Sequence, residues 1–284
     1  MNNNYINEII NRRYNTDKGY LYLIDLLKEK YPNFNISEEN LNKLSIEEVS
    51  KEMFLETSFV GIYTAKDNKI RIFTNYDIDG NEIIPGIEIT EEELINTFLH
   101  ELIHCVSSKV DGEMIYEGFN MRVDGQSSYF LGINEGITQM ITDDILGYQS
   151  DAYVFQTIIA RQLGEIVGKD NLVKAYSNND IMMFEDLVMS KDFNFNFKDF
   201  IINNFYFNLI LNGHLFNNAE MIGTNIQEQL LLLGKDKIND LVLNSNRINE
   251  LVHLLPIDVF SFSDIGFDDI DNVVNKYMDD DYTR

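Results

Sequence analysis

The stretch that decides the fold is TEEELINTFLHELIHCVS, residues 90–107. Thr90 and Glu93 have the spacing of a capping box, and further acidic residues lie in the first turn, where they stabilise the positive end of a helix dipole. The segment therefore predicts a helix over residues 91–107. Apolar residues cover more than one stripe of this helix, so we expect it to be buried on most sides.

The same stretch contains H-E-x-x-H, with His100 and His104 four residues apart. On a helix this spacing puts both imidazoles on one face, where they can hold one metal ion. Glu101 points about 100° away. From there its carboxylate can reach a metal-bound water, as a general base must. Two imidazoles and a carboxylate leave a fourth position for water and suit zinc, so we predict one Zn²⁺ per chain.

A third metal ligand is predicted in GINEGITQM, residues 132–140. Glu135 follows His104 by 31 residues and lies at the start of a second predicted helix, which Asn134 is expected to cap. Gly136 is expected to let the two helices approach closely near the metal. Two helices and three ligands, His100, His104 and Glu135, complete the predicted site.

The two motifs, H-E-x-x-H at residues 100–104 and N-E-G-x-T at residues 134–138, resemble the gluzincin branch of the zincin metallopeptidases. Within that branch they are similar to a non-secreted bacterial group, over about residues 60 to 170. The resemblance implies an α+β, predominantly helical fold: a zincin-like catalytic domain with a small antiparallel β-sheet and a helical C-terminal part. It implies zinc-dependent hydrolysis of peptide bonds, with a peptide or protein as substrate.

The resemblance also implies roles for residues outside the two motifs. Gluzincins often stabilise the oxyanion with a Tyr or His from a separate segment; Tyr153 is the first candidate and Tyr129 the second. Thermolysin-like gluzincins carry Asp four residues after the third ligand, where this chain has Gln139. The amide can accept an N–H from a ligand histidine and fix its tautomer, but it raises ligand basicity less than a carboxylate. Asp143 or Asp144 is the alternative.

The remaining sequence predicts how the chain is organised. Residues 1–150 should contain N-terminal helices, a β-hairpin and the zinc-binding helices, and residues 151–284 a helical subdomain that completes the cleft. Two β-rich runs around Val60–Tyr63 and Ile70–Phe73 predict the hairpin. The second run is the expected edge strand to which an extended peptide adds. Gly168, Gly213 and Gly234 are expected at helix ends, and His214 and His253 as core or boundary residues.

The charge balance narrows the range of partners. The chain has 47 acidic against 22 basic residues, a formal net charge of −25. Such a surface repels phosphate backbones and anionic lipid head groups, so neither nucleic acid nor a membrane is an expected partner. No run resembles a signal-peptide core or reaches the ~20 apolar residues of a spanning helix, and the single cysteine, Cys105, fits a reducing compartment. We expect a cytoplasmic protein, with export by a route without a cleaved signal left open.

Three functions are consistent with these patterns. The first is a zinc endopeptidase or aminopeptidase, in which Glu101 activates water. The second is a catalytically weak or inactive zinc- or peptide-binding protein on a zincin scaffold, for which Gln139 is the motivation. The third is a helical interaction protein with an acidic surface, in which H-E-x-x-H is a coincidence. The oligomeric state is not determined by the sequence.

Overall fold

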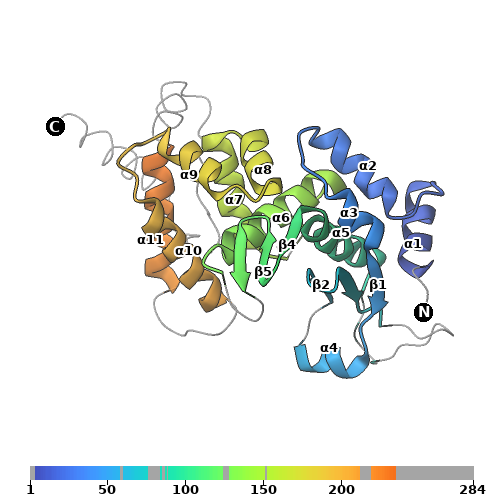
Figure 1. Cartoon of the computed structure of the whole chain (residues 1–284). Coiled ribbons are helices and arrows are strands. Elements are labelled where there is room, and N and C mark those ends of the chain that lie inside the picture. The colour runs from blue at the N-terminus through green and yellow to red at the C-terminus, as the bar shows by residue number, and fades with distance from the viewer. Residues whose placement is uncertain are drawn as a thin grey trace, which may run out of the picture. The chain divides into compact units, whose positions relative to one another are not determined.

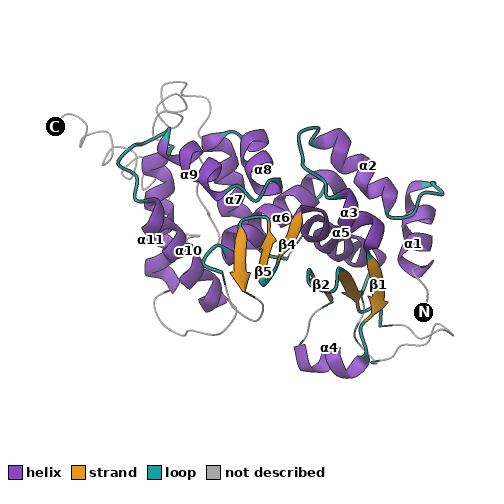
Figure 2. Cartoon of the chain, in the orientation of Figure 1, coloured by secondary structure: helices purple, strands orange, loops and turns teal. Residues whose placement is uncertain are grey.

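A computed structural model of the chain describes residues 4–57, 60–75, 84, 87, 89–123, 128–150, 152–211 and 219–234. Helices predominate and the strands form two small sheets, so the protein is α+β as predicted (Figures 1 and 2). None of the helices in these ranges is long and apolar enough to cross a membrane. Gly213, His214 and His253 lie outside the described residues, and so does the part of the predicted helical C-terminal region that follows residue 234.

The described residues fall into two compact units. The first unit contains the described residues of Met1–Ser128, Ile137–Tyr153 and Val173–Asp180. The second unit contains the described residues of Tyr129–Gly136, Val154–Leu172 and Ile181–Arg284. The predicted division at residue 150 stays a prediction.

Most of the strands and helices belong to the first unit. Its helices are α1 (Asn4–Tyr14), α2 (Leu21–Lys30), α3 (Glu38–Lys43), α4 (Lys51–Thr57), α5 (Glu91–Ser107) and the later part of α6 (Leu131–Leu146). Its strands are β1 (Ser45–Glu48), β2 (Gly61–Thr64), β3 (Lys69–Ile72), β4 (Ser108–Asp111), β5 (Met114–Glu117) and β6 (Asn120–Val123). Helix α8 (Lys169–Ser177) ends in this unit.

Helix α5 has the bounds that the sequence predicts. The Thr90 hydroxyl accepts a hydrogen bond from the backbone N–H of Glu93, and the Glu93 carboxylate accepts one from the N–H of Thr90, so the capping box is present. From Leu94 onward nearly every side chain is buried. The expectation of burial on most sides is therefore confirmed, and the helix forms the centre of its unit.

The first sheet has the strand order β1-β3-β2. Strands β2 and β3 form the predicted antiparallel hairpin, but β1 adds to β3 in parallel, so this sheet is mixed. The prediction that Ile70–Phe73 is an edge was therefore wrong, because β3 is the central strand. Glu47 of β1 lies opposite Arg71 of β3 and forms ion pairs with Arg71 and Lys69.

The second sheet, β4-β5-β6, is antiparallel and was not predicted. Its strands are four residues long and carry many charged side chains, so they show little of the alternation that marks a half-buried strand. Gly112 was the available signal: Gly112 and Glu113 form the two-residue loop between the paired residues Asp111 and Met114, and Gly112 has the positive φ, 63°, that favours glycine at the first position of such a loop.

Helix α6 begins at Leu131, three residues before the predicted start. Asn134 is therefore inside the helix, where it is buried and its backbone N–H donates to the carbonyl of Phe130 at 2.8 Å. Its predicted role as the cap was wrong. The Gly-Ile-Asn-Glu-Gly sequence has the composition of a loop, but burial of the segment outweighs these weak local preferences.

The second unit contains α7 (Val154–Val167), α9 (Ile181–Met189), α10 (Phe197–Leu211) and α11 (Ala219–Leu233). Aromatic pairs such as Phe184–Phe197 and Phe155–Phe207 hold it together. Helix α7 ends at Val167, and Gly168 follows it with a φ of 91°. The prediction of a helix end at Gly168 is therefore confirmed. Gly136 does allow a close approach, but to α7: a Cβ added there would lie 2.1 Å from the backbone oxygen of Gln156.

We expect Gly136→Ala to lower the free energy of unfolding by about 1–3 kcal/mol, because the new methyl group would force the backbones of α6 and α7 apart. Urea denaturation measures this change. Gly164→Ala is the control, since its Cβ would meet only ordinary contacts of 3.5 Å or more inside α7. A helix-interior Gly→Ala exchange of this kind should stabilise by about 0.5–1 kcal/mol. Equal effects of the two substitutions would contradict the proposed close approach.

Candidate metal centre

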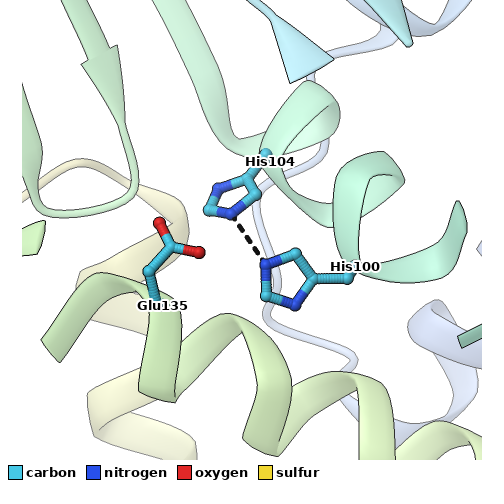
Figure 3. A group of neighbouring side chains, drawn as sticks. All are labelled: His100, His104 and Glu135. Atoms are coloured by element: carbon cyan, nitrogen blue, oxygen red, sulfur yellow. Dashed lines mark hydrogen bonds between the residues drawn. The ribbon is translucent and has the colours of Figure 1, made fainter. Parts of the chain in front are cut away.

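The three predicted ligands lie together. His100 and His104 come from α5 and Glu135 from α6, and one ligand atom of each lies within 4.8 Å of the other two. Among the described residues this is the group of metal-ligating side chains that meets that condition. Figure 3 shows the Glu135 carboxylate directed toward the two imidazole rings.

The geometry of the histidines fits a tetrahedral ion. Nε2 of His100 lies 3.2 Å from Nε2 of His104, and the ring planes meet at 69°. Two nitrogens that each lie about 2.05 Å from a tetrahedral zinc ion are about 3.3 Å apart. Both histidines are buried, whereas Glu135 is half-buried. The donor set of two imidazoles and one carboxylate is therefore suited to zinc with one position left for water.

Gln139 lies one helical turn after Glu135 and contacts the first ligand. Its Oε1 is 2.9 Å from Nδ1 of His100, which is the contact expected for this side chain. Its Nε2 donates to Oδ1 of Asp143 at 2.8 Å and to Oδ1 of Asn96 at 3.1 Å. Asp144, the other acid considered, accepts instead from the hydroxyl of Tyr31.

Glu101 follows His100 directly in α5 and is not one of the three grouped ligands. Its Oε2 accepts a hydrogen bond of 2.7 Å from the backbone N–H of Tyr63 on β2. The N–H of Phe73 bonds to the carbonyl of Val60 at 2.7 Å, so even-numbered residues of β2 make the ladder with β3. The main-chain groups of Tyr63 therefore face away from β3, and the N–H can hold the carboxylate.

Strand β2 is fixed to the C-terminal end of α5 by a buried polar network. The Tyr63 hydroxyl lies 2.8 Å from Oγ of Ser108 and 3.0 Å from Oδ1 of Asn68. Nδ2 of Asn40 in turn donates to Oγ of Ser108 at 2.9 Å. Burial raises the pKa of Tyr63, so its hydroxyl stays protonated within this network. The network sets the position of the N–H that holds Glu101.

The two tyrosine candidates differ in their placement. Tyr153 immediately precedes α7, at a φ of 52°, which is unusual for a residue with a side chain. Its ring stacks on that of His100, with centroids 5.1 Å apart and planes at 12°. Tyr129 is exposed, and its ring packs on the edge of Phe205. The ring of Tyr153 therefore lies face to face with the ring of His100, one of the three grouped ligands.

Three participants in this arrangement were not predicted: Asn96, the backbone of Tyr63, and the bond between Gln139 and Asp143. Asn96 had a signal, since it lies four residues before His100 on the same face of α5. Gln139 and Asp143 have the same spacing on α6. The contact of Tyr63 with Glu101 joins residues 38 positions apart, and no local pattern marks it.

Comparison with known proteins identifies no relative: no protein-family model, no curated protein and no solved structure matches the chain.

Cys105 should be unreactive in the folded protein. It is buried next to His104, and burial raises the pKa of its thiol to about 12. Because the thiolate is the nucleophile, alkylation by iodoacetamide at about pH 8.5 should be more than about 100-fold slower in folded than in urea-unfolded protein. The folded pKa exceeds the unfolded one, so the thiol contributes a loss of stability as the pH rises above about 9. Equal alkylation rates in both states would contradict a buried, neutral thiol.

Proposed function

We propose that this protein is a zinc-dependent peptidase with a zincin-like catalytic domain. The observation that carries the proposal is the convergence of His100, His104 and Glu135, while Glu101, next to His100 in α5, is outside the ligand set and is held by the N–H of Tyr63. A metal site with a general base next to it is suited to hydrolysis. The acidic surface, with a net charge of −25, supports a peptide rather than a nucleic acid as the partner. We assign the protein to the cytoplasm, since its single cysteine fits a reducing compartment.

His100, His104 and Glu135 would hold the ion, and the chemistry that bound zinc supplies there is a lower pKa of water and a polarised substrate carbonyl. Glu101 would take the proton from the attacking water and deliver it to the leaving amine. The N–H of Tyr63 occupies Oε2 of this carboxylate and so fixes its orientation.

Among the described strands, β2 is the edge strand of the first sheet that contacts α5, and the proposal assigns the substrate backbone to it in place of the predicted strand Ile70–Phe73. The main-chain groups of Gly61 and the carbonyl of Tyr63 face away from β3 and are assigned to the substrate, whereas the N–H of Tyr63 already donates to Glu101. An extended peptide that adds to such an edge is bound through its backbone, which permits varied side chains. A Cβ at Gly61 would lie 2.4 Å from Cγ2 of Thr97, so the close approach of this edge to α5 requires glycine.

A catalytically weak zinc- or peptide-binding protein is the second candidate. Two observations favour it: the neutral amide of Gln139 contacts His100 where thermolysin-like gluzincins have a carboxylate, and Tyr153 meets His100 through the face of its ring. Retention of Glu101, held in a defined orientation, favours the peptidase.

The proposal predicts about one zinc per chain in purified wild type after zinc supplementation, measured by elemental analysis. His100→Ala and Glu135→Ala should lose or greatly weaken zinc binding, because each removes a ligand. Glu101→Gln should keep the zinc but reduce hydrolysis of a fluorogenic peptide library by roughly 10²–10⁴-fold, the range for loss of a general base.

The matched control is Glu185→Gln, an exposed glutamate on α9, which should change neither zinc content nor hydrolysis. A wild type that takes up no zinc would refute the proposal. A wild type that binds zinc without measurable hydrolysis would favour the second candidate.

A further inference from the structure

We propose that Asp143 is a positioning residue for His100, which acts through the amide of Gln139 and selects the imidazole tautomer that presents Nε2 to the metal. The inference rests on the proposed function for its purpose, since tautomer selection matters only at a ligand. Its physical content is independent of catalysis and can be tested on the metal-free protein.

Four buried side chains make the connection. Nδ1 of His100 lies 2.9 Å from Oε1 of Gln139, whose Nε2 donates to Oδ1 of Asp143 at 2.8 Å and Oδ1 of Asn96 at 3.1 Å. Each of the four is at most 5% exposed. Water therefore competes little for these bonds, and each polar atom depends on its neighbours for a partner.

The direction of every bond follows from the carboxylate. An ionised carboxylate only accepts hydrogen bonds, so Gln139 must turn its NH₂ group toward Asp143 and its carbonyl oxygen toward His100. Nδ1 of His100 must then carry the hydrogen and donate it. Nε2 of the neutral ring is left with its lone pair, on the side where Nε2 of His104 lies 3.2 Å away.

Gln139 alone has no such preference. Its amide, rotated by half a turn, would donate to Nδ1 of His100 and put the hydrogen on Nε2, where it would block metal binding. Asn96 does not decide the matter either, because its own amide can rotate in the same way. Of the three side chains bonded to the Gln139 amide, Asp143 alone has a fixed polarity, and the backbone N–H of Ser150, 3.3 Å from the same Oδ1, reinforces it.

This arrangement explains how a neutral residue can occupy the position next to a ligand histidine. The carboxylate is still present, one amide further from the ring, and the amide transmits its requirement for a donor. Residues that orient a ligand in this way typically change metal affinity by about 10–100-fold when they are replaced.

The test is the tautomer of His100 in the metal-free protein, read from long-range ¹H–¹⁵N correlations of labelled histidine at about pH 8.5. Wild type should carry its hydrogen on Nδ1. Asp143→Asn can donate to Oε1 of Gln139, so the amide can rotate, and we expect a mixed or reversed tautomer and zinc affinity about 10–100-fold lower by competition with a chelator.

The control is Asp144→Asn, since Asp144 is the neighbouring acid on α6 and bonds to Tyr31 instead. It should leave both the tautomer and the zinc affinity unchanged. The rescue is Gln139→Glu combined with Asp143→Asn, which moves the carboxylate directly onto Nδ1 of His100. We expect it to restore the Nδ1–H tautomer and most of the zinc affinity, which a merely structural role of Asp143 would not allow.

An unchanged tautomer in Asp143→Asn would overturn the inference, and so would a loss of zinc affinity that the double variant does not restore. These results are separate from those that decide the proposed function. A wild type that binds zinc without hydrolysing peptides would refute the peptidase and leave the tautomer measurement valid.

Discussion

The structure around the site depends on the burial of two imidazoles on one face of α5. A buried polar ring needs hydrogen-bond partners or a metal, and its helix must be held firmly enough to keep the two Nε2 atoms 3.2 Å apart. Side chains from neighbouring segments bond to both ends of α5. At the N-terminal end Arg13 of α1 pairs with Glu92, and at the C-terminal end Asn179 donates to the carbonyl of Ser107 at 2.7 Å.

The position of Glu101 also depends on contacts at the C-terminal end of α5. The carboxylate is held by a backbone N–H of β2, and β2 is held by the bonds of the Tyr63 hydroxyl to Ser108 and Asn68. A backbone donor cannot rotate as a side chain can, so it fixes the carboxylate more closely. The buried network behind the strand thus helps to determine where the proposed base lies.

Helix α6 shows why a ligand helix can have a poor helical pattern. Its inner face carries polar side chains that bond to one another and to neighbours: Thr138 to the hydroxyl of Tyr176 at 2.7 Å, and Gln139 to Asp143 at 2.8 Å. A helix that buries such groups has no clear apolar stripe. The same polar face supplies the partner that His100 requires, Gln139.

The sequence by itself determined the features that arise within a few residues. The capping box and the acidic first turn set the bounds of α5, the spacing of His100 and His104 put them on one face, and two β-rich runs joined by a turn set the β2–β3 hairpin. Tertiary structure decided the rest: the parallel pairing of β1, the second sheet, the early start of α6 and the bond from Tyr63 to Glu101. Helix caps and side chains one turn apart depend on neighbours in the chain, so a local pattern records them. Strand pairing and buried hydrogen bonds join segments far apart in sequence, and their energy comes from removal of water from surfaces that only the folded chain brings together.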